Sequence, residues 1–558
     1  MKKENKTKKS INFKFNLLAI ICISIFIIGM VERTLQNDTY YTITLGKYIL
    51  NNGIDMMEHF SWHQGLIYTY PHWLYDVLLY IVFNAFGFFG IYVSSVVLGI
   101  ILGVSVYIVL SKISKNNLIS FFVTLLIMFL GRHYITARAQ LVTFILFVWT
   151  MYFIEMFLNT KKKRYAIGLI LIPIAIANIH AAVFPFYFIL FLPYIGEYII
   201  ALLKENIDLP TLLFLKSDKI EIKKLSNKKE LTEKEIKKLE QLTKRVEVNE
   251  KRIETKRELA KAKEGKEYKI VINKKDNVKC LIIIMIICIF TGLITPIGDT
   301  PYTYLIHTMQ GNTTENISEH LPMVLAQDMS AIVIISVYLI MLAFTKTKVR
   351  LSDLFLNIGL IVLALMSRRQ LSMLCFIGVI ALNNIISDFI KLYSTEKQIE
   401  QVKKAMVTWK GQIIAYILVI LVTGVMLFDS KDNKIVNDAL YPVKACDYIL
   451  EKLDVNNIKI FNDYNYGSYL MYRGIPVFID SRADVYDPKF NGLKDDIFQD
   501  YIKTSGLNKY YEDTFEHYGI THVISYANSK LALYLSHDYD YKELYKDKNF
   551  VIYERLSK

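Results

Sequence analysis

Apolar stretches that approach the length of a membrane span recur along the chain from Phe13 to Phe428. Short charged turns, or turns that contain Gly or Pro, separate most of these stretches. A transmembrane helix needs about 20 mainly apolar residues, and no soluble core needs so many segments of this kind. The pattern therefore predicts an α-helical polytopic membrane protein over residues 1–428, with about eleven spans and one partial segment.

The positively charged residues predict how the chain threads the membrane, because cytoplasmic loops carry an excess of Lys and Arg. Lysines precede the first apolar segment, which places the N-terminus in the cytoplasm. No small-residue cleavage site follows that segment, so we interpret it as an uncleaved helix. The alternation then predicts an external loop over 32–71, a cytoplasmic helical insert over 204–279 and an extracytoplasmic C-terminus.

One part of this topology conflicts with the charge rule. The segments 72–88 and 89–110 are predicted as two spans, which leaves Lys112 and Lys115 outside the membrane. The next apolar run, 118–130, has only about two-thirds of a spanning length, so we expect it either to dip into the membrane and return or to lie against the bundle.

Composition narrows the function classes. The net charge of +14 would suggest a nucleic-acid partner in a soluble protein, but the positive residues lie beside apolar segments. The positive-inside rule explains these residues as signals for membrane topology, so we expect no nucleic-acid partner. The five cysteines show no paired spacing, so the sequence predicts neither a disulfide framework nor a zinc site.

Two regions lack the membrane pattern. In the insert, residues 220–269 are dense in Lys and Glu, and Leu239, Leu242, Val246 and Ile253 follow a heptad-like spacing. This spacing predicts a helical hairpin or a short coiled coil, either as an exposed structural insertion or as an arm that docks a partner.

The second region, 429–558, is predicted to be a small external α/β domain, because short apolar runs alternate with helical patterns. The expected strands are 458–461, 477–480, 522–525 and 550–553, and the expected helices are 441–453 and 467–473. Asp480 and Arg482 follow the predicted strand 477–480, where α/β sheets bind ligands. Arg482 could equally pair with Asp480 or Asp463 and hold the loops together.

In this topology the polar groups at the ends of the apolar segments share the external face. They comprise the loop from Glu32 to His72, Arg132, Arg138, Asn178, His180, the stretch from His307 to His320, Arg368 and Arg369. Ionisable groups near membrane depth are costly and are usually functional or paired. Their convergence on one face predicts a site there.

Several short motifs occur in this order along nearly the whole chain. They are Asp38-Thr39-Tyr40-Tyr41 with Gly46, Phe60-Ser61-Trp62, His72-Trp73-Leu74, Arg138-Ala139-Gln140, Asn178-Ile179-His180, Thr295-Pro296-Ile297-Gly298, Glu319-His320 and Ser367-Arg368-Arg369. Their order and placement resemble the C-type (GT-C) glycosyltransferases, and 462–484 is similar to the appended domain of uncharacterised bacterial members. The resemblance implies a multi-span enzyme that moves a sugar from a polyprenyl-phosphate donor on the external face.

The resemblance also implies roles for individual residues. Asp38 and Glu32 would be catalytic, with Asp38 deprotonating or aligning the acceptor. The donor phosphate needs cations, and the candidates are Arg132, Arg138, His180, Arg368 and Arg369. Candidates for binding the substrates are Tyr41, Glu58, Trp62, His72, Glu319, Asp480 and Arg482.

The chain departs from the family at one point, because the loop contains no tight pair of carboxylates. No cofactor is therefore certain, the metal ligands are unknown, and dependence on a divalent cation stays open. The implied partners are a polyprenyl-phosphate-linked sugar, membrane lipid and an extracytoplasmic glycan, lipid or protein acceptor, which places the chain in the plasma membrane.

Two other function classes remain at this point. A secondary transporter would show internal repeats and broken helices near the midplane, and the sequence shows no convincing repeat. A ligase or polymerase of lipid-linked polysaccharide would also use external Arg and His, but the acidic loop favours glycosyl transfer.

Overall fold

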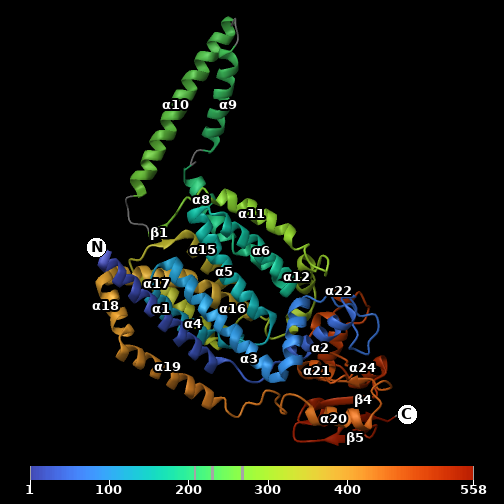
Figure 1. Cartoon of the computed structure of the whole chain (residues 1–558). Coiled ribbons are helices and arrows are strands. Elements are labelled where there is room, and N and C mark those ends of the chain that lie inside the picture. Colours follow the sequence, from blue (N-terminus) through green and yellow to red (C-terminus); the bar gives the residue numbers. More distant parts are fainter. Residues whose placement is uncertain (1, 206–208, 228–231, 265–268, 557–558) are drawn as a thin grey trace.

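The computed structural model describes residues 2–205, 209–227, 232–264 and 269–556. Figure 1 shows a helical bundle, a pair of helices that projects from one end of it, and a unit with a small β-sheet at another end. We call the bundle end that carries the sheet the site end, and the end from which the helical pair projects the insert end.

The described residues contain six helical segments that are long and apolar enough to cross a membrane. They are Lys9–Met30, Trp73–Ser114, Ala139–Thr160, Ala181–Lys204, Arg368–Tyr393 and Trp409–Asp429. Four shorter apolar helices are Asn117–Leu130, Val278–Thr291, Met329–Phe344 and Leu351–Met366. The chain is thus a multi-pass membrane protein, and the predicted count of about eleven spans stays a prediction.

The bundle contains α1 (Lys2–Met30), α3 (Trp73–Ser114), α4 (Asn117–Leu130), α5 (Ala139–Thr160), α6 (Lys163–Ile179), α7 (Phe184–Ile189), α8 (Leu192–Glu205), α11 (Val278–Thr291), α14 (Met329–Phe344), α15 (Leu351–Met366), α16 (Leu371–Met373), the π-helical η5 (Leu374–Gly378), α17 (Val379–Tyr393) and α19 (Trp409–Asp429). Shorter connecting elements are α2 (Asn37–Asn52), η1 (Arg132–Tyr134), η2 (Ala181–Val183), α12 (Thr300–Gln310), α13 (Thr313–Asn316), η3 (Leu325–Gln327), η4 (Arg368–Gln370) and α18 (Glu396–Val407).

Helix α3 corrects the predicted topology. It bends at Gly87, which has a φ of 62°. Phe83 and Phe88, on the two sides of this bend, both contact the Tyr472 ring, with centroids 5.8 and 5.4 Å away. The segment 72–88 therefore stays at the site end, and the prediction that it forms a span of its own is wrong.

The apolar character of this segment has another cause, which is its packing against α2. A Cβ atom added to Gly46 of α2 would lie 2.1 Å from the carbonyl oxygen of Asp76, so only glycine allows this close approach. Hydropathy measures apolarity and does not distinguish a protein neighbour from lipid.

The rest of α3 runs to the insert end, where Lys391 donates to the carbonyl of Ser114 at 3.4 Å. Lys112 and Lys115 line a cavity there together with Lys275, which belongs to the predicted cytoplasmic insert 204–279. Helix α4 then leads back to the site end, where His133 after it contacts Glu32. The predicted partial segment 118–130 is therefore a helix that connects both ends, and the conflict with the charge rule disappears.

The insert contains two helices, α9 (Leu209–Ser226) and α10 (Glu233–Glu264), which lie side by side (Figure 1). Leu242 is buried between them, and Lys238 pairs with Glu221 at 2.7 Å. These are the helices that the sequence predicted, whereas a coiled coil stays a prediction. The turn between them, at 228–231, lies outside the described residues.

The C-terminal region has a four-stranded sheet in the order β3-β4-β6-β5, with β3 parallel to β4 and the other pairs antiparallel. Its elements are α20 (Val443–Lys452), β3 (Ile460–Phe461), α21 (Tyr464–Tyr472), η6 (Ala483–Tyr486), α22 (Pro488–Asn491), α23 (Ile497–Ser505), α24 (Tyr511–Tyr518), β4 (His522–Tyr526), α25 (Lys530–Leu535), β5 (Tyr541–Lys546) and β6 (Phe550–Arg555). Two strand residues, β1 (Ile270–Val271), pair in parallel with β2 (Val349–Arg350) at the base of the insert.

The predicted strand 477–480 is not part of this sheet. Val477 instead exchanges backbone hydrogen bonds with the first loop, donating to Phe60 at 3.2 Å and accepting from Trp62 at 3.4 Å. The apolar run is buried, but its polar backbone groups are satisfied by the loop rather than by a neighbouring strand. Strand β5 escaped prediction because its sequence, Tyr-Lys-Glu-Leu-Tyr-Lys, is mostly polar and half of its residues are exposed.

The first loop and the C-terminal region share one hydrophobic core. Tyr40 in α2 is fully buried, and its ring contacts Tyr441 and Tyr469 with centroids 4.8 and 5.0 Å away. The predicted domain boundary at 428/429 stays a prediction, but the core crosses it. This shared core fixes α2, and with it Asp38, at the site end of the bundle.

Candidate active site at the site end of the bundle

Asp38 lies in the first turn of α2, where a carboxylate is favoured by the partial positive charge of a helix N-terminus. Its Oδ2 pairs with Nη2 of Arg138 at 2.6 Å, although one hundred positions separate the two residues. Arg138 immediately precedes α5. Both side chains are about four-fifths buried, with exposed fractions of 22% and 23%.

Arg138 also binds a second carboxylate. Its Nη1 donates to both oxygens of Glu319, at 3.2 and 3.3 Å. Burial lowers the pKa of Arg138, but the negative charges of Asp38 and Glu319 raise it by a larger amount. The pKa of Arg138 is therefore higher than its usual value. A permanently charged guanidinium thus bridges two carboxylates from different parts of the chain.

Glu319 is held in place by the backbone of η4. The N–H of Arg369 donates to the carbonyl of Glu319 at 2.9 Å, and that of Arg368 donates to Leu321 at 3.0 Å. Burial raises the pKa of Glu319, but Arg138 and Arg369 lower it by more, so the carboxyl is ionised. The same backbone contacts bring Arg369 beside the Arg138 bridge.

Two cavities meet at this bridge. The smaller, about 30 Å³, is lined by Asp38, Tyr41, Thr42, His72, Tyr75, Arg138, Ala139, Gln140, His180 and Arg369. The larger, about 390 Å³, is lined by Gln36, Leu130, His133, Tyr134, Thr136, Arg138, Gln140, Ser318, Glu319, Asp328, Ser330, Arg368, Arg369 and Leu371. Arg138, Gln140 and Arg369 line both cavities, so a ligand in the larger one would face the Asp38 cluster.

The cations at these cavities differ in their partners. Arg368 pairs with Asp328 at 3.5 Å. Arg369 is half-buried and lies 3.5 Å from His320 Nε2, and within the described part of the chain it has no ion pair with a carboxylate. Arg132 lies over the Phe129 ring at 4.6 Å and does not line either cavity. Arg369 is therefore the cation most available to an anionic ligand.

Two histidines form the wall of the smaller cavity. The rings of His72 and His180 lie 5.3 Å apart, and His180 Nδ1 is 2.9 Å from the hydroxyl of Thr143. Burial lowers the pKa of His72 to about 3, helped by Arg369 and Arg138, and burial also holds the pKa of His180 well below its usual value. Both imidazoles are therefore neutral at pH 7 and offer hydrogen bonds rather than charge.

The residues present do not fit a divalent cation at this position. A metal would need free carboxylates, yet Asp38 and Glu319 are both paired with Arg138. Within the described ranges, no group of three or more His, Cys, Asp or Glu residues has a geometry that could hold a metal. The positive charge between the carboxylates comes from the guanidinium, and we derive no step that uses a metal.

Glu32, the second predicted catalytic residue, lies apart from Asp38. It pairs with His133 at 3.1 Å, and its side chain is 48% exposed. The hydrogen bond from His133 lowers the pKa of Glu32. Glu32 lines neither of the two cavities, and its catalytic role stays a prediction.

Arg482, Glu58 and Asp480 form a separate buried cluster. Arg482 binds Glu58 at 2.5 and 3.0 Å and Asp480 at 2.6 and 2.9 Å, and all three side chains are at most 2% exposed. This cluster joins the first loop to the C-terminal region. Arg482 also lines a cavity of about 40 Å³ with Tyr41 and His72, and the predicted substrate-binding roles remain untested.

Trp62 packs within the same interface rather than beside Asp38. Its Nε1 donates to the carbonyl of Ile460 at 3.0 Å, and Lys459 lies 5.3 Å from its ring. A role in stacking on sugars stays a prediction for this residue, whereas Tyr41 does line the Asp38 cavity.

Sequence reasoning missed three polar residues around the cavities. Gln140 lines both, although it lies in the same motif as Arg138. Asp328 partners Arg368, and Asp484 accepts hydrogen bonds from Tyr304 at 2.5 Å and Thr313 at 3.1 Å. The only signal for Asp484 was its place in the polar run that begins at Asp480.

Comparisons with known proteins bear on the fold. No family model matches the chain, and no curated protein matches its sequence. The apo structure of the Archaeoglobus fulgidus oligosaccharyltransferase is similar, with a TM-score of 0.54 and 11% identity over 92% of this chain and 69% of that one. A structure of AglB from the same organism, in complex with an inhibitory peptide and a dolichol-phosphate, gives a TM-score of 0.54 and 11% identity over 96% and 74%.

Identity this low carries information about the fold alone, and the likeness extends over nearly the whole chain. The chain therefore has the GT-C glycosyltransferase fold of the archaeal oligosaccharyltransferases.

Proposed function

We propose that this chain is a membrane glycosyltransferase that moves a sugar from a polyprenyl-phosphate donor to an acceptor outside the cytoplasm. The observation that carries the proposal is the Asp38–Arg138–Glu319 bridge beside Arg369, which has no carboxylate partner among the described residues. Arg138 and Arg369 both line the two neighbouring cavities. The GT-C fold supports it, and so does a similar structure that holds a dolichol-phosphate, which is itself a polyprenyl phosphate.

In this proposal the larger cavity takes the donor phosphate. Arg369 contacts the phosphate oxygens, because a planar guanidinium matches their geometry, and Arg368 adds a second cation at the cavity wall. The neutral His72 and His180 line the smaller cavity, where they can donate hydrogen bonds to the transferred sugar without adding charge. The polyprenyl chain extends from the cavity toward the lipid that surrounds the bundle.

Asp38 then accepts the proton of the acceptor. The acceptor oxygen or nitrogen forms a bond to the anomeric carbon of the sugar, the bond from that carbon to the phosphate oxygen breaks, and polyprenyl phosphate leaves. Positioned general bases contribute about two to four orders of magnitude to such rates. Arginines that are already in place stabilise the charge on the departing phosphate.

The proposed topology puts the site end outside the plasma membrane and the insert end in the cytoplasm, with the N-terminus inside and the C-terminus outside. Lys112, Lys115, Lys275, Lys348 and Lys391 all line the cavity at the insert end, which is the pattern that cytoplasmic ends show. The acceptor is a glycan, lipid or protein that is reached from outside the cell.

The test uses the purified full-length chain in lipid nanodiscs, with synthetic polyprenyl-phosphate hexoses as donors and a cell-envelope extract as acceptor. Mass spectrometry follows the release of polyprenyl phosphate. We expect release by the wild type and a drop of at least tenfold for Arg369→Gln, because the phosphate loses its unpaired cation. Arg33→Gln is the matched control, since Arg33 lies at the same end and lines neither cavity.

Analysis of a deletion strain gives an independent result. Accumulated polyprenyl-phosphate sugar supports the proposal, whereas accumulated polyprenyl-diphosphate oligosaccharide indicates a ligase or polymerase instead. The proposal fails if the folded wild-type protein releases no polyprenyl phosphate and the strain accumulates no lipid-linked sugar.

A further inference from the structure

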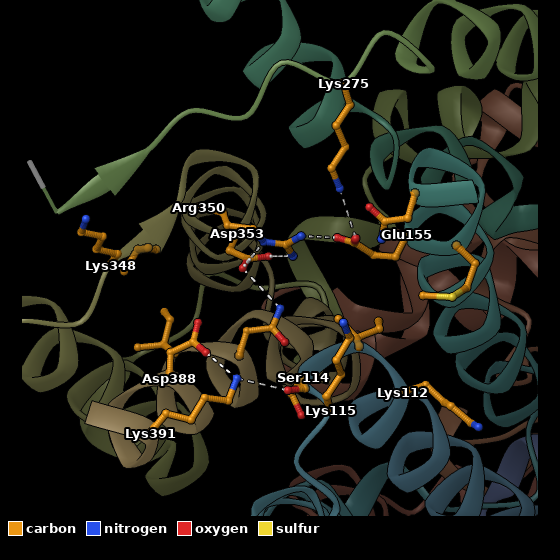
Figure 2. A pocket seen from close by; sticks show the side chains of 16 residues that line it. Lys112, Ser114, Lys115, Glu155, Lys275, Lys348, Arg350, Asp353, Asp388 and Lys391 are labelled. Atoms are coloured by element: carbon orange, nitrogen blue, oxygen red, sulfur yellow. Dashed lines mark hydrogen bonds and ion pairs between the residues drawn. The ribbon is translucent and has the colours of Figure 1, made fainter. Parts of the chain in front are cut away.

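A second polar cavity lies at the insert end of the bundle, opposite the candidate active site. Its volume is about 330 Å³, and Figure 2 shows the side chains that line it. They come from α3, α5, α17 and the first turn of α15, and from the segments that precede α11 and α15. Nothing in the proposed glycosyl transfer uses this cavity.

The lining has an excess of positive charge. Six cationic side chains, Lys112, Lys115, Lys275, Lys348, Arg350 and Lys391, face three carboxylates, Glu155, Asp353 and Asp388. With all of them ionised, the excess is three positive charges. Such a cavity favours an anionic ligand.

Every carboxylate at the cavity already has a cationic partner. Glu155 and Asp353 are 2% and 5% exposed, and Arg350 binds them at 2.8 and 2.7 Å. Lys275 lies 3.6 Å from Glu155, and Lys391 pairs with Asp388 at 2.8 Å. Figure 2 shows these pairs as dashed lines, with Glu155 and Asp353 at the Arg350 guanidinium and the Lys391–Asp388 pair apart from it.

Three lysines account for the excess charge. Lys112, Lys115 and Lys348 are exposed, and within the described ranges they have no ion pair with a carboxylate. Figure 2 places Lys348 on the opposite side of the cavity from Lys112. Lysine side chains are long and flexible, so the three ammonium groups can converge on a ligand between them.

We propose that this cavity binds the phosphate group of an anionic ligand, with the headgroup of an anionic phospholipid as its expected source. The cavity lies at the ends of the membrane helices, where lipid headgroups are found, and basic pockets between helices at the cytoplasmic side bind such headgroups. Arg350 is held in place by its ion pairs with Glu155 and Asp353, and these three side chains form a polar wall of the cavity. The three lysines supply the excess positive charge. A water-soluble phosphate ester has the same recognition chemistry.

The test measures binding to the full-length chain in a neutral detergent by native mass spectrometry. The probes are phosphatidylglycerol, zwitterionic phosphatidylcholine and water-soluble glycerol 3-phosphate. The variant combines Lys112→Gln, Lys115→Gln and Lys348→Gln. Its matched control combines Lys161→Gln, Lys162→Gln and Lys163→Gln, because these exposed lysines follow α5 and do not line the cavity.

The control is also matched in backbone geometry. Lys115 and Lys161 each end a helix in the left-handed conformation, with φ of 59° and 53°. We expect the wild type and the control to prefer phosphatidylglycerol over phosphatidylcholine. The cavity variant should bind phosphatidylglycerol about fivefold more weakly for each lysine removed.

Competition identifies the source of the phosphate. If glycerol 3-phosphate does not displace phosphatidylglycerol, the ligand is a lipid headgroup; if it displaces the lipid and itself binds with the same lysine dependence, the ligand is soluble. Either result supports a phosphate site. Equal binding of phosphatidylglycerol and glycerol 3-phosphate by the cavity variant and the control overturns the proposal. These measurements involve no sugar transfer, so they stand apart from the proposed enzyme activity.

A single substitution keeps the test decisive if the triple variant does not fold. Lys348→Gln removes one cavity lysine, and Lys346→Gln removes an exposed lysine two positions away that does not line the cavity. We expect only Lys348→Gln to weaken the binding of phosphatidylglycerol. The same affinity in both single variants would contradict the proposal.

Discussion

Asp38→Asn separates a catalytic role for Asp38 from a structural one. The substitution keeps the shape of the side chain but removes its charge and most of its ability to accept a proton. Arg138 does not lose all of its partners, because Glu319 still binds it at 3.2 Å. Asp38 lies in the first turn of α2 and is not its N-cap residue, which is Gln36, so the substitution removes no capping hydrogen bond. We therefore expect a loss of stability of only about 1 kcal/mol, between the values for exposed and buried ion pairs.

The rate should fall far more than the stability. If Asp38 accepts the proton of the acceptor, its removal lowers the rate of transfer by about two to four orders of magnitude. Binding of polyprenyl phosphate should change little, because Arg369, which has no carboxylate partner among the described residues, lies in η4 and not on α2. The assay is single-turnover release of polyprenyl phosphate from a synthetic polyprenyl-phosphate hexose at saturating donor, with thermal unfolding of the same samples as a control.

A double-mutant cycle with Arg138→Gln tests the alternative that Asp38 only positions Arg138. A positioning residue has nothing left to position once Arg138 is gone, so the double variant would transfer sugar at the rate of Arg138→Gln alone. A base remains necessary without Arg138, so we expect the double variant to be at least tenfold slower. Wild-type transfer by Asp38→Asn, or equal rates for Arg138→Gln and the double variant, would refute the reasoning.

Three further outcomes follow from the structure. The pH profile of kcat/KM should show no inflection near pH 6.5, because the pKa of His72 is about 3 and its imidazole stays neutral above pH 5; an inflection that His72→Gln abolishes would contradict this. In a cysteine-free background, Lys115→Cys should react with an impermeant thiol reagent only after the cells are permeabilised, whereas Lys431→Cys should react in intact cells; labelling of both in intact cells would restore two spans over 72–110. Arg482→Met leaves two buried carboxylates unpaired and should cost roughly 3–5 kcal/mol, seen as a lower thermal midpoint in detergent. Arg473→Met breaks a pair that is 21% and 52% exposed, so it should cost less than about 1 kcal/mol; equal costs would show that the Arg482 cluster does not hold the loop.

Hydropathy and charge predicted the helical bundle, because an apolar helix and a basic loop are local properties of the sequence. They failed over 72–110, where the same apolar character has two causes. The first part of α3 packs on α2 through Gly46, and the second part runs through the bundle. Only the three-dimensional neighbours of Phe83 and Phe88 distinguish these cases.

The sequence predicted which residues lie at the candidate site, but it did not predict which of them form ion pairs with one another. Charge and topology placed Asp38, Arg138 and Glu319 on one face, and the structure brings them into contact. No local pattern says that Arg138 takes both carboxylates while Arg369 keeps no carboxylate partner among the described residues. The choice depends on η4, whose backbone hydrogen bonds set the position of Glu319.

Glu58 illustrates the same limit. The family resemblance made it a substrate-binding candidate in the predicted external loop 32–71. In the structure its carboxylate binds Arg482, from a segment more than four hundred positions later. A buried arginine is stable only with a charged partner, and the fold can supply that carboxylate from any part of the chain. The sequence therefore predicted correctly that Arg482 pairs with a carboxylate, and it identified one of the two partners, Asp480.

The bridge at Arg138 links the two halves of the proposed reaction. In the resting site its positive charge is balanced by Asp38 at 2.6 Å and Glu319 at 3.2 Å. Proton transfer to Asp38 removes one of these negative charges at the moment when the departing phosphate gains one. Arg138 is then less compensated, and its field adds to that of Arg369 across the cavities that both residues line. Asp38 and Arg138 should therefore be partly coupled in the double-mutant cycle, so that the second substitution costs less than it does alone but still slows the reaction.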